Sequence, residues 1–235
     1  MNVFQRISGV FFNPKPVFDS VAEKPVWVDV LVVLLIALAA FSLLVSPYSR
    51  HDQLVMYKES SALKEKLGET RYNAQVQALE NPMTTGMVLQ TVLGGPLFIL
   101  FAMLLQAGIL LLLGRFVSTQ GRFAQIFASL VHASSINLLL GNAVRLGLSV
   151  LRKSAFQTST GLALLFPKMA VTSKAYIVLS QVDFFQLWMF GVLAFGIAAA
   201  LKINLKKALV LSYTIWFIKA LFNIGFLLWS VSFIR

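Results

Sequence analysis

The sequence contains no cysteine, and this absence excludes disulfide bonds, thiolate metal sites and a cysteine nucleophile. It has two histidines and nine acidic residues in 235 positions, spread along the chain, which argues against a clustered metal site. No H-E-x-x-H, G-x-S-x-G or P-loop pattern occurs, and no pair of carboxylates falls within an apolar stretch. We therefore expect a protein that is not an enzyme and that carries no metal and no cofactor.

Charged residues are also scarce. They make up 12% of the chain, and hydrophobic residues make up 58%. Soluble domains have about 25% charged residues and about 45–50% hydrophobic residues. A bilayer accommodates that much apolar surface, so the composition indicates a polytopic membrane protein. The net charge of +11 fits basic residues that flank apolar spans and meet anionic lipid headgroups. We expect membrane lipids, and no nucleic acid, as partners of these cations.

Five apolar stretches reach the length of about 20 residues that a membrane-spanning helix needs. They cover about residues 26–45, 87–113, 123–151, 184–201 and 208–233. We expect Ser46 and Pro47 to close the first span, because proline interrupts a helix. The sequence thus predicts an all-α polytopic membrane protein in which residues 26–235 form a bundle of five transmembrane helices.

Residues 1–25 precede the first span and contain no apolar run longer than "VFF". A cleaved signal needs about 7–15 apolar residues, so we do not expect one here. Apolar side chains instead recur at helical spacing in two short segments, the second of which follows Pro16. These apolar positions are Phe4, Ile7 and Phe11 in the first segment and Phe18, Val21 and Ala22 in the second. We predict two amphipathic interfacial helices in the headgroup region, with a disordered tail as the alternative.

The sizeable polar segment is the loop at residues 46–86, which is rich in helix-forming residues. Gly68 lies near its middle, and Asn81 with Pro82 ends the helix-forming stretch. We therefore predict an extracytoplasmic helical hairpin. It is either a solvated structural element or a docking surface for a partner outside the cytoplasm.

The short loops after the second and fourth spans carry cations and no acid. Their basic residues are Arg115, Arg122, Lys202, Lys206 and Lys207. Together with Arg6, Lys15 and Lys24 of the N-terminal segment, they make the inside about as rich in cations as the outer loops, but short loops weigh most in the positive-inside rule. We predict a cytoplasmic N-terminus and an extracytoplasmic C-terminus.

Two polar stripes interrupt the apolar spans. Lys219 lies about 11 residues into the fifth span, near the membrane midplane at 1.5 Å per residue. The stripes consist of Gln125, Ser129, His132 and Ser135 in the third span and of Ser212, Lys219, Asn223 and Ser230 in the fifth. They form either hydrogen-bonded seams between helices or a polar cavity. In such a cavity Lys219 would bind an anion or a lipid headgroup, and His132 would respond to protons.

Three polar residues lie toward the outer ends of the spans. We expect Asp183 and Gln186 to form the outer-end cap of the fourth span, because a carboxylate stabilises a helix N-terminus. Arg145 is expected to extend its guanidinium to the outer interface. An ion pair between Lys219 and Asp183 is disfavoured, since the two residues differ in depth by more than a helical turn.

Three segments, taken in order, resemble the Yip (Ypt-interacting protein) family of five-span membrane proteins in its bacterial form. They are "F.NPK..F..VAEKP.W" before the first span, "GRFAQIFASLVHASSINLLLGNAV" at the third and "VDFFQLWMFGVLAFGIAAALKINLKKAL" across the fourth and fifth. The D-x-F-x-x-W step at Asp183, Phe185 and Trp188 is the most specific part. The resemblance extends from about Phe11 to Trp229.

The resemblance implies five helices, a cytosolic N-terminus and no catalytic residues. Eukaryotic members carry a long cytosolic extension and act in vesicle traffic with small GTPases, and we do not expect that link for a chain without the extension. For bacterial members the resemblance implies an accessory role in the inner (cytoplasmic) membrane, sometimes beside ABC-type exporters. Our first hypothesis is a non-enzymatic adaptor that associates with another integral membrane complex. The alternative is a transporter or lipid-handling protein with a polar cavity between the third and fifth spans.

Overall fold

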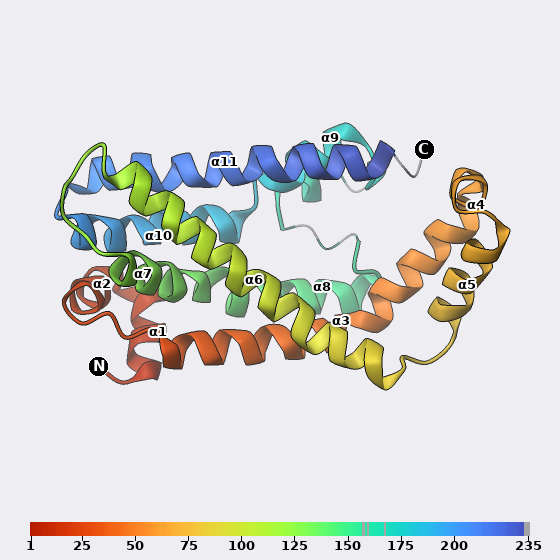
Figure 1. Cartoon of the computed structure of the whole chain (residues 1–235), viewed down its shortest axis with the longest axis horizontal. Coiled ribbons are helices and arrows are strands. Elements are labelled where there is room, and N and C mark those ends of the chain that lie inside the picture. The colour runs from red at the N-terminus through yellow and green to blue at the C-terminus, as the bar shows by residue number, and fades with distance from the viewer. Residues whose placement is uncertain (157, 159, 167, 233–235) are drawn as a thin grey trace. The chain divides into compact units, whose positions relative to one another are not determined.

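The computed structural model describes residues 1–156, 158, 160–166 and 168–232 (Figure 1). Within this part of the chain, five helical stretches are long and apolar enough to cross a membrane, which confirms the all-α fold with five candidate spans. They are α3 (Val28–Glu59), α6 (Thr85–Gly114), α7 to α8 (Phe123–Arg152), α10 (Phe184–Leu201) and α11 (Leu205–Ser232). Phe233, at which the fifth predicted span ends, lies outside the described residues.

The chain forms two compact units, and α3, α6 and α11 each contribute residues to both. The first unit comprises Met1–Leu38, Gly95–Asn142 and Phe184–Lys219. The second comprises Ala39–Gly94, Ala143–Asp183 and Ala220–Arg235.

The first unit begins with the two predicted short helices, α1 (Val3–Phe12) and α2 (Pro14–Glu23). The side chains of Asn2 and Gln5 each bond the other residue's backbone N–H, which forms a capping box at the start of α1. The apolar side of α2, including Phe18, is buried against α7 and α10, which lie beside it in Figure 1. Phe4 and Phe12 of α1 stay exposed. Placement of these helices in the headgroup region stays a prediction.

The core of the first unit is centred on α7 (Phe123–Ser135) and α10. The two helices approach closely at Gly196, where an added Cβ would lie 2.5 Å from the Cβ of Ser129 and 2.8 Å from a ring carbon of Phe18. Only a glycine leaves room for this contact among three elements. After α7 the chain continues through a π-helical turn, η1 (Ile136–Gly141), into α8 (Asn142–Arg152).

The loop after α6 is fixed to the end of α10. The guanidinium of Arg115 donates to the carbonyl oxygens of Thr119, Gln120 and Gly121 at 2.7–3.2 Å. The hydroxyl of Ser118 donates to the carbonyl of Leu201 at 2.6 Å. The bond from Ser118 satisfies a carbonyl at the C-terminus of α10, where the last carbonyls have no partner inside the helix. The bonds from Arg115 join the loop to itself.

In the second unit, α3 does not end at Ser46 and Pro47 as the sequence led us to expect. The helix continues through Pro47 to Glu59. Proline has no N–H to donate to the carbonyl four residues earlier, which is that of Leu43. The hydroxyl of Ser46 donates to this carbonyl at 2.9 Å instead, so the free acceptor is satisfied and the helix continues.

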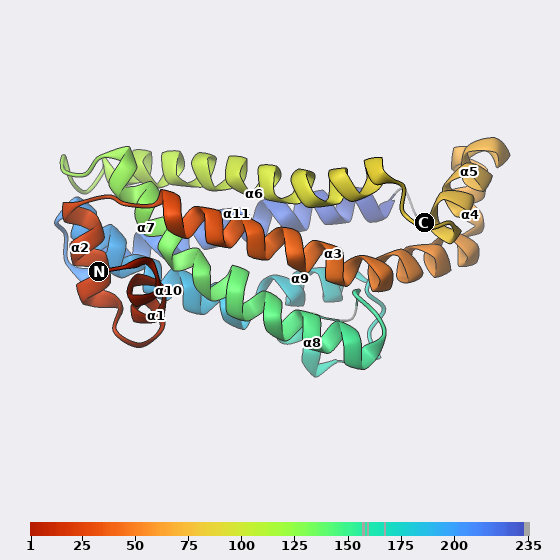
Figure 2. The ribbon, with the colours of Figure 1, turned by 90° about the horizontal axis from the view of Figure 1, so that it is seen from below.

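Two short helices follow α3, as predicted, and Figure 2 shows them next to each other. They are α4 (Ser61–Leu67) and α5 (Glu69–Glu80). Gly68 separates them with a φ of +75°, a conformation that glycine adopts without steric cost. Asn81 ends α5.

The chain between α8 and α10 contains the short 3₁₀ helix η2 (Leu162–Leu165) and α9 (Lys174–Gln181). The hydroxyl of Tyr176 donates to the carbonyl of Phe156 at 3.0 Å, and burial raises the pKa of this phenol. A single antiparallel bridge joins Gly161 to Asp183. The connection between α8 and α10 is therefore folded back on itself: Tyr176 contacts its beginning at Phe156, and Gly161 contacts its end at Asp183.

Candidate functional site

The polar stripe of the third span is buried in the first unit. Gln125 joins α7 to α2, because its amide nitrogen donates to the carbonyl of Ala22 at 2.6 Å. Ser129 donates to the carbonyl of Gln125 at 2.8 Å, within the same helix. Nδ1 of His132 lies 2.8 Å from the carbonyl of Ala128, which makes Nδ1 the protonated nitrogen. Ser129 and Nδ1 of His132 are thus satisfied by their own helix, and Gln125 by α2.

Two polar atoms of this stripe have no hydrogen-bond partner among the described residues. They are Nε2 of His132 and Oγ of Ser135, and both side chains are fully buried. An unsatisfied buried polar group costs about 1–3 kcal/mol, so this part of the stripe is a candidate site and not a completed seam. Whether a cavity accompanies it stays a prediction.

An arginine and an aspartate that sequence reasoning did not pair meet near this histidine. A guanidinium nitrogen of Arg6, on α1, donates to the carboxylate of Asp29, at the start of α3. A second nitrogen of Arg6 donates to the carbonyl of Met1 at 2.9 Å. Both charges lie close enough to act electrostatically on His132. The sequence signal was weak, because Arg6 lies on an amphipathic helix whose polar side chains usually face water.

The polar stripe of the fifth span divides among several partners. Ser212 donates to the carbonyl of Phe190 in α10 at 2.5 Å. Lys219 donates to Oε1 of Gln186, also in α10, at 2.8 Å, and its Nζ lies 6.0 Å from the ring centroid of Phe190. Ser212 and Lys219, the two members of this stripe in the first unit, therefore face α10.

The remaining two members of this stripe belong to the second unit. The amide of Asn223 donates to Oε1 of Gln181 in α9 at 3.3 Å. Ser230 donates to the carbonyl of Leu227 in its own helix at 2.9 Å. The stripe that looks continuous in sequence is thus divided among α10, α9 and its own backbone.

Asp183 and Gln186, the predicted cap residues, have partners that the sequence did not indicate. Asp183 is buried in the second unit, where one guanidinium nitrogen of Arg145 lies 3.1 Å from each of its carboxylate oxygens. The hydroxyl of Thr160 also donates to this carboxylate. The guanidinium of Arg145 is thus paired with a buried carboxylate, which needs a charged partner, and its extension to the outer interface stays a prediction. Gln186 instead accepts from Lys219, and the capping role of the two residues stays a prediction.

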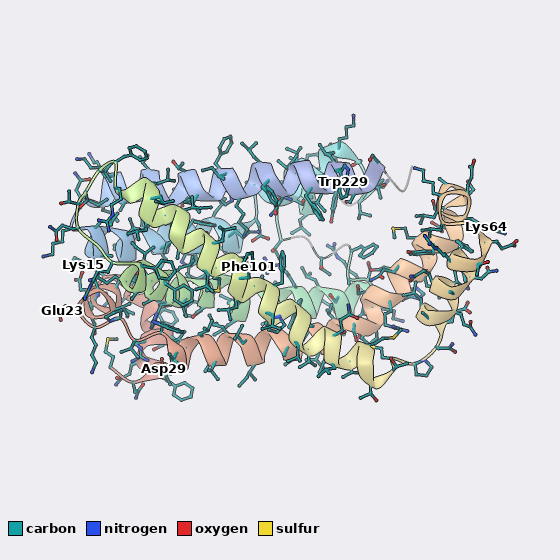
Figure 3. The ribbon with its side chains drawn as sticks, in the orientation of Figure 1. Lys15, Glu23, Asp29, Lys64, Phe101 and Trp229 are labelled. Atoms are coloured by element: carbon teal, nitrogen blue, oxygen red, sulfur yellow. The ribbon has the colours of Figure 1, made fainter. Side chains whose placement is uncertain are left out.

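The helical hairpin has an anchor of its own in the second unit. One guanidinium nitrogen of Arg50 donates to the carbonyls of Ala78, Leu79 and Asn81 at 2.6–3.1 Å, which fixes the end of α5 to α3. No residue of α5 is buried. Lys64, labelled in Figure 3, extends from α4 and lies 6.0 Å from the ring centroid of Tyr72.

Two further contacts hold the hairpin in place. Lys58 forms an ion pair with Glu80 at 2.7 Å, and the hydroxyl of Tyr72 donates to the carbonyl of Tyr57 at 3.2 Å. Both contacts join α3 to α5. The hairpin is therefore built onto α3 by polar contacts, and its sequence signal is the run of helix formers around Gly68.

These features define a class of protein: a polytopic helical membrane protein whose polar groups form helix contacts and an ordered hairpin. Comparison with known families agrees with this class. The model of the Yip1 domain matches residues 8–227, so the chain belongs to the Yip1 domain family of membrane proteins. No curated protein and no solved structure matches the chain.

Proposed function

We propose that this protein is a non-enzymatic accessory subunit of a bacterial inner membrane and that it binds another integral membrane complex. An ABC-type exporter is the candidate partner. The acid-free cationic loops after the second and fourth spans support a cytoplasmic N-terminus and an extracytoplasmic C-terminus. The hairpin of α4 and α5 would then face the extracytoplasmic side and make the contact.

The observation that carries this proposal is that the hairpin is firmly anchored and yet leaves one side of α5 free. Tyr72 and Val76 face the anchored side, where they are half-buried. Thr70, Ala74 and Gln77 lie on the opposite side of the helix, and all three are exposed. A preformed helix surface binds a partner without the entropy cost of ordering a loop, which favours a docking role.

The test changes this exposed side without touching the anchor. We would purify the tagged protein in native nanodiscs as wild type and with Ala74→Glu combined with Gln77→Arg. The control is Thr119→Glu combined with Gln120→Arg, which puts the same two new charges on exposed positions of the loop after α6. We expect mass spectrometry to find a membrane complex in fixed ratio with the wild type and the control, and its loss from the double variant.

Two results would contradict the proposal. One is an unchanged amount of the partner with the double variant, which would place the contact elsewhere. The other is a wild-type sample that contains lipid and no protein partner in fixed ratio. Circular dichroism of all three samples checks that the helical content is the same.

A second candidate function, transport or lipid handling, is favoured by the position of Lys219. Its ammonium group, about halfway along the fifth span, donates to a neutral amide and lies over an aromatic ring. A lysine at membrane depth marks a functional hypothesis because its burial is costly. We would measure movement of fluorescent phospholipid in liposomes with wild type, Lys219→Leu, Lys219→Arg and His132→Leu. Loss with both leucine variants and retention with arginine would support this function, and equal rates in all four would exclude it.

A further inference from the structure

The segment between α8 and α9, in the second unit, exposes large apolar side chains at a loop. Leu162, Leu164, Leu165 and Phe166 are 42%, 40%, 70% and 49% exposed. These four belong to the 3₁₀ helix η2 and the residue after it. In water such a run would be unfavourable, because hydrophobic burial scales with the apolar area removed from solvent.

The exposure of these side chains is fixed by the backbone beneath them. Leu162 donates its N–H to the carbonyl of Val182 at 3.1 Å, while Ala163 between the exposed leucines is buried. At Gly161 an added Cβ would lie 2.9 Å from the carbonyl oxygen of Ser180, so the loop is pressed against the end of α9. One side of the loop is therefore seated in the second unit, and the leucines on its other side are directed outward.

The charge of this segment has one sign. No acidic residue occurs between Glu80 and Asp183, while cations lie at Arg152, Lys153, Lys168 and Lys174. All four of these basic residues are exposed. Exposed cations around an apolar surface are the composition with which proteins bind an anionic bilayer surface.

Two carboxylates do contact the segment, and both are occupied by it. One carboxylate oxygen of Asp52 accepts from the hydroxyl of Ser154 at 2.9 Å and from the N–H groups of Ala155 and Phe156 at 2.6 and 2.9 Å. Asp183 is paired with Arg145. Both carboxylates are thus taken up by hydrogen bonds or by an ion pair. The charge that the segment presents outward is therefore positive.

We propose that residues 162–166 insert into the bilayer interface and that Lys153, Lys168 and Lys174 bind anionic phospholipid headgroups there. A shallow depression lined by Leu165, Phe166, Lys168 and Met169 provides a place where a lipid chain lies beside a cation. The loop thereby anchors the second unit to the bilayer surface, on the side of the membrane where the connection between α8 and α9 lies. This inference does not depend on the proposed protein partner, because none of the inserting or headgroup-binding residues lies on the proposed docking side of the hairpin.

The natural absence of cysteine makes the test direct, since a single introduced cysteine is the sole labelling site. We would attach a nitroxide spin label to Leu165→Cys and, as a water-exposed control outside the proposed docking side, to Glu65→Cys in α4. Each full-length protein is placed in nanodiscs of phosphatidylcholine alone or with phosphatidylglycerol. Power-saturation measurements then compare the accessibility of the label to oxygen, which enters bilayers, and to a polar nickel chelate, which does not.

We expect the ratio of oxygen to nickel accessibility at residue 165 to be several-fold higher than at residue 65. We also expect it to rise further with phosphatidylglycerol, and this rise to be lost when Lys153, Lys168 and Lys174 are all replaced by serine. Equal ratios at the two positions would overturn the insertion. A high ratio at residue 165 that changes neither with phosphatidylglycerol nor with the three serine replacements would overturn headgroup binding.

Discussion

Two arginine–aspartate pairs occur in the described part of the chain, one in each unit, and they differ in which partner is more deeply buried. In the first unit the side chain of Arg6 is 9% exposed and that of Asp29 is 43% exposed. Figure 3 labels Asp29, at the start of α3. In the second unit the order is reversed, because the side chain of Arg145 is 17% exposed and that of Asp183 is 6% exposed.

The difference teaches which half of each pair the fold depends on. Removing one partner leaves the other charge in place, and the cost is large when the remaining charge is buried. The first pair should therefore be sensitive to loss of Asp29, and the second to loss of Arg145. An ion pair counted by distance alone would hide this asymmetry.

The largest effect is expected from Arg145→Met, which keeps the side-chain volume and strands the buried carboxylate of Asp183. The expected cost is about 3–5 kcal/mol of unfolding free energy. Equilibrium unfolding by SDS in mixed micelles measures it. Asp183→Asn serves as the control, and it should cost less because the amide still bonds Thr160 and no carboxylate is buried. An equal cost for the two variants would contradict the assignment.

The next effect is expected at the first pair, where Asp29→Ala leaves the buried guanidinium of Arg6 with the carbonyl of Met1. Hydrogen bonds to charged groups contribute about 1.5–3 kcal/mol, and we expect a loss in that range. Arg6→Met should cost clearly less, because the half-exposed carboxylate of Asp29 can be hydrated. The same unfolding measurement decides the order, and a larger cost for Arg6→Met would reverse our interpretation.

A smaller effect is expected from Thr160→Val, which removes one donor to Asp183 while keeping the shape of the side chain. The ion pair with Arg145 remains, so we expect a loss of about 1 kcal/mol. Combining Thr160→Val with Arg145→Met should give less than the sum of the two losses, because both act on one carboxylate. Strict additivity would show that Thr160 does not act through Asp183.

The smallest effect is expected at an ion pair on the surface. Lys15 and Asp19 are 2.8 Å apart on α2, and their side chains are 74% and 50% exposed. Exposed pairs of this spacing contribute about 0.3–0.5 kcal/mol, so Lys15→Ala should change stability by no more than that. A change comparable to that of Asp29→Ala would mean that α2 is held by this pair and not by its buried apolar side.

The helices could be predicted from the sequence because their signals are local. A bilayer forces backbone groups to form hydrogen bonds within each segment, so a run of about 20 apolar residues is enough to predict a membrane-spanning helix. The apolar side of α2, with Phe18 and Val21, and the break at Gly68 are also visible in short windows. The predicted end of the first span at Pro47 was wrong because of the residue before it. The hydroxyl of Ser46 donates to the carbonyl that has no proline N–H to accept from, so the helix continues.

The candidate site could be predicted only in part. The residues of both polar stripes stood out because polar side chains are rare in apolar spans. Their partners did not, since Lys219 bonds Gln186 in another helix and Asn223 bonds Gln181. The two arginine–aspartate pairs were missed for the same reason, as Arg145 and Asp183 are 38 residues apart.

The sequence by itself determined the membrane class, the five apolar helices, the paired short helices at the N-terminus and the hairpin around Gly68. Each of these depends on composition or on a period of a few residues, and such patterns are fixed by the local chain. Tertiary structure alone decided which charge of each ion pair is buried, which carbonyls hold the hairpin, and that the leucines at 162–165 face outward. These follow from contacts between segments far apart in the chain, and no local pattern encodes where such segments meet.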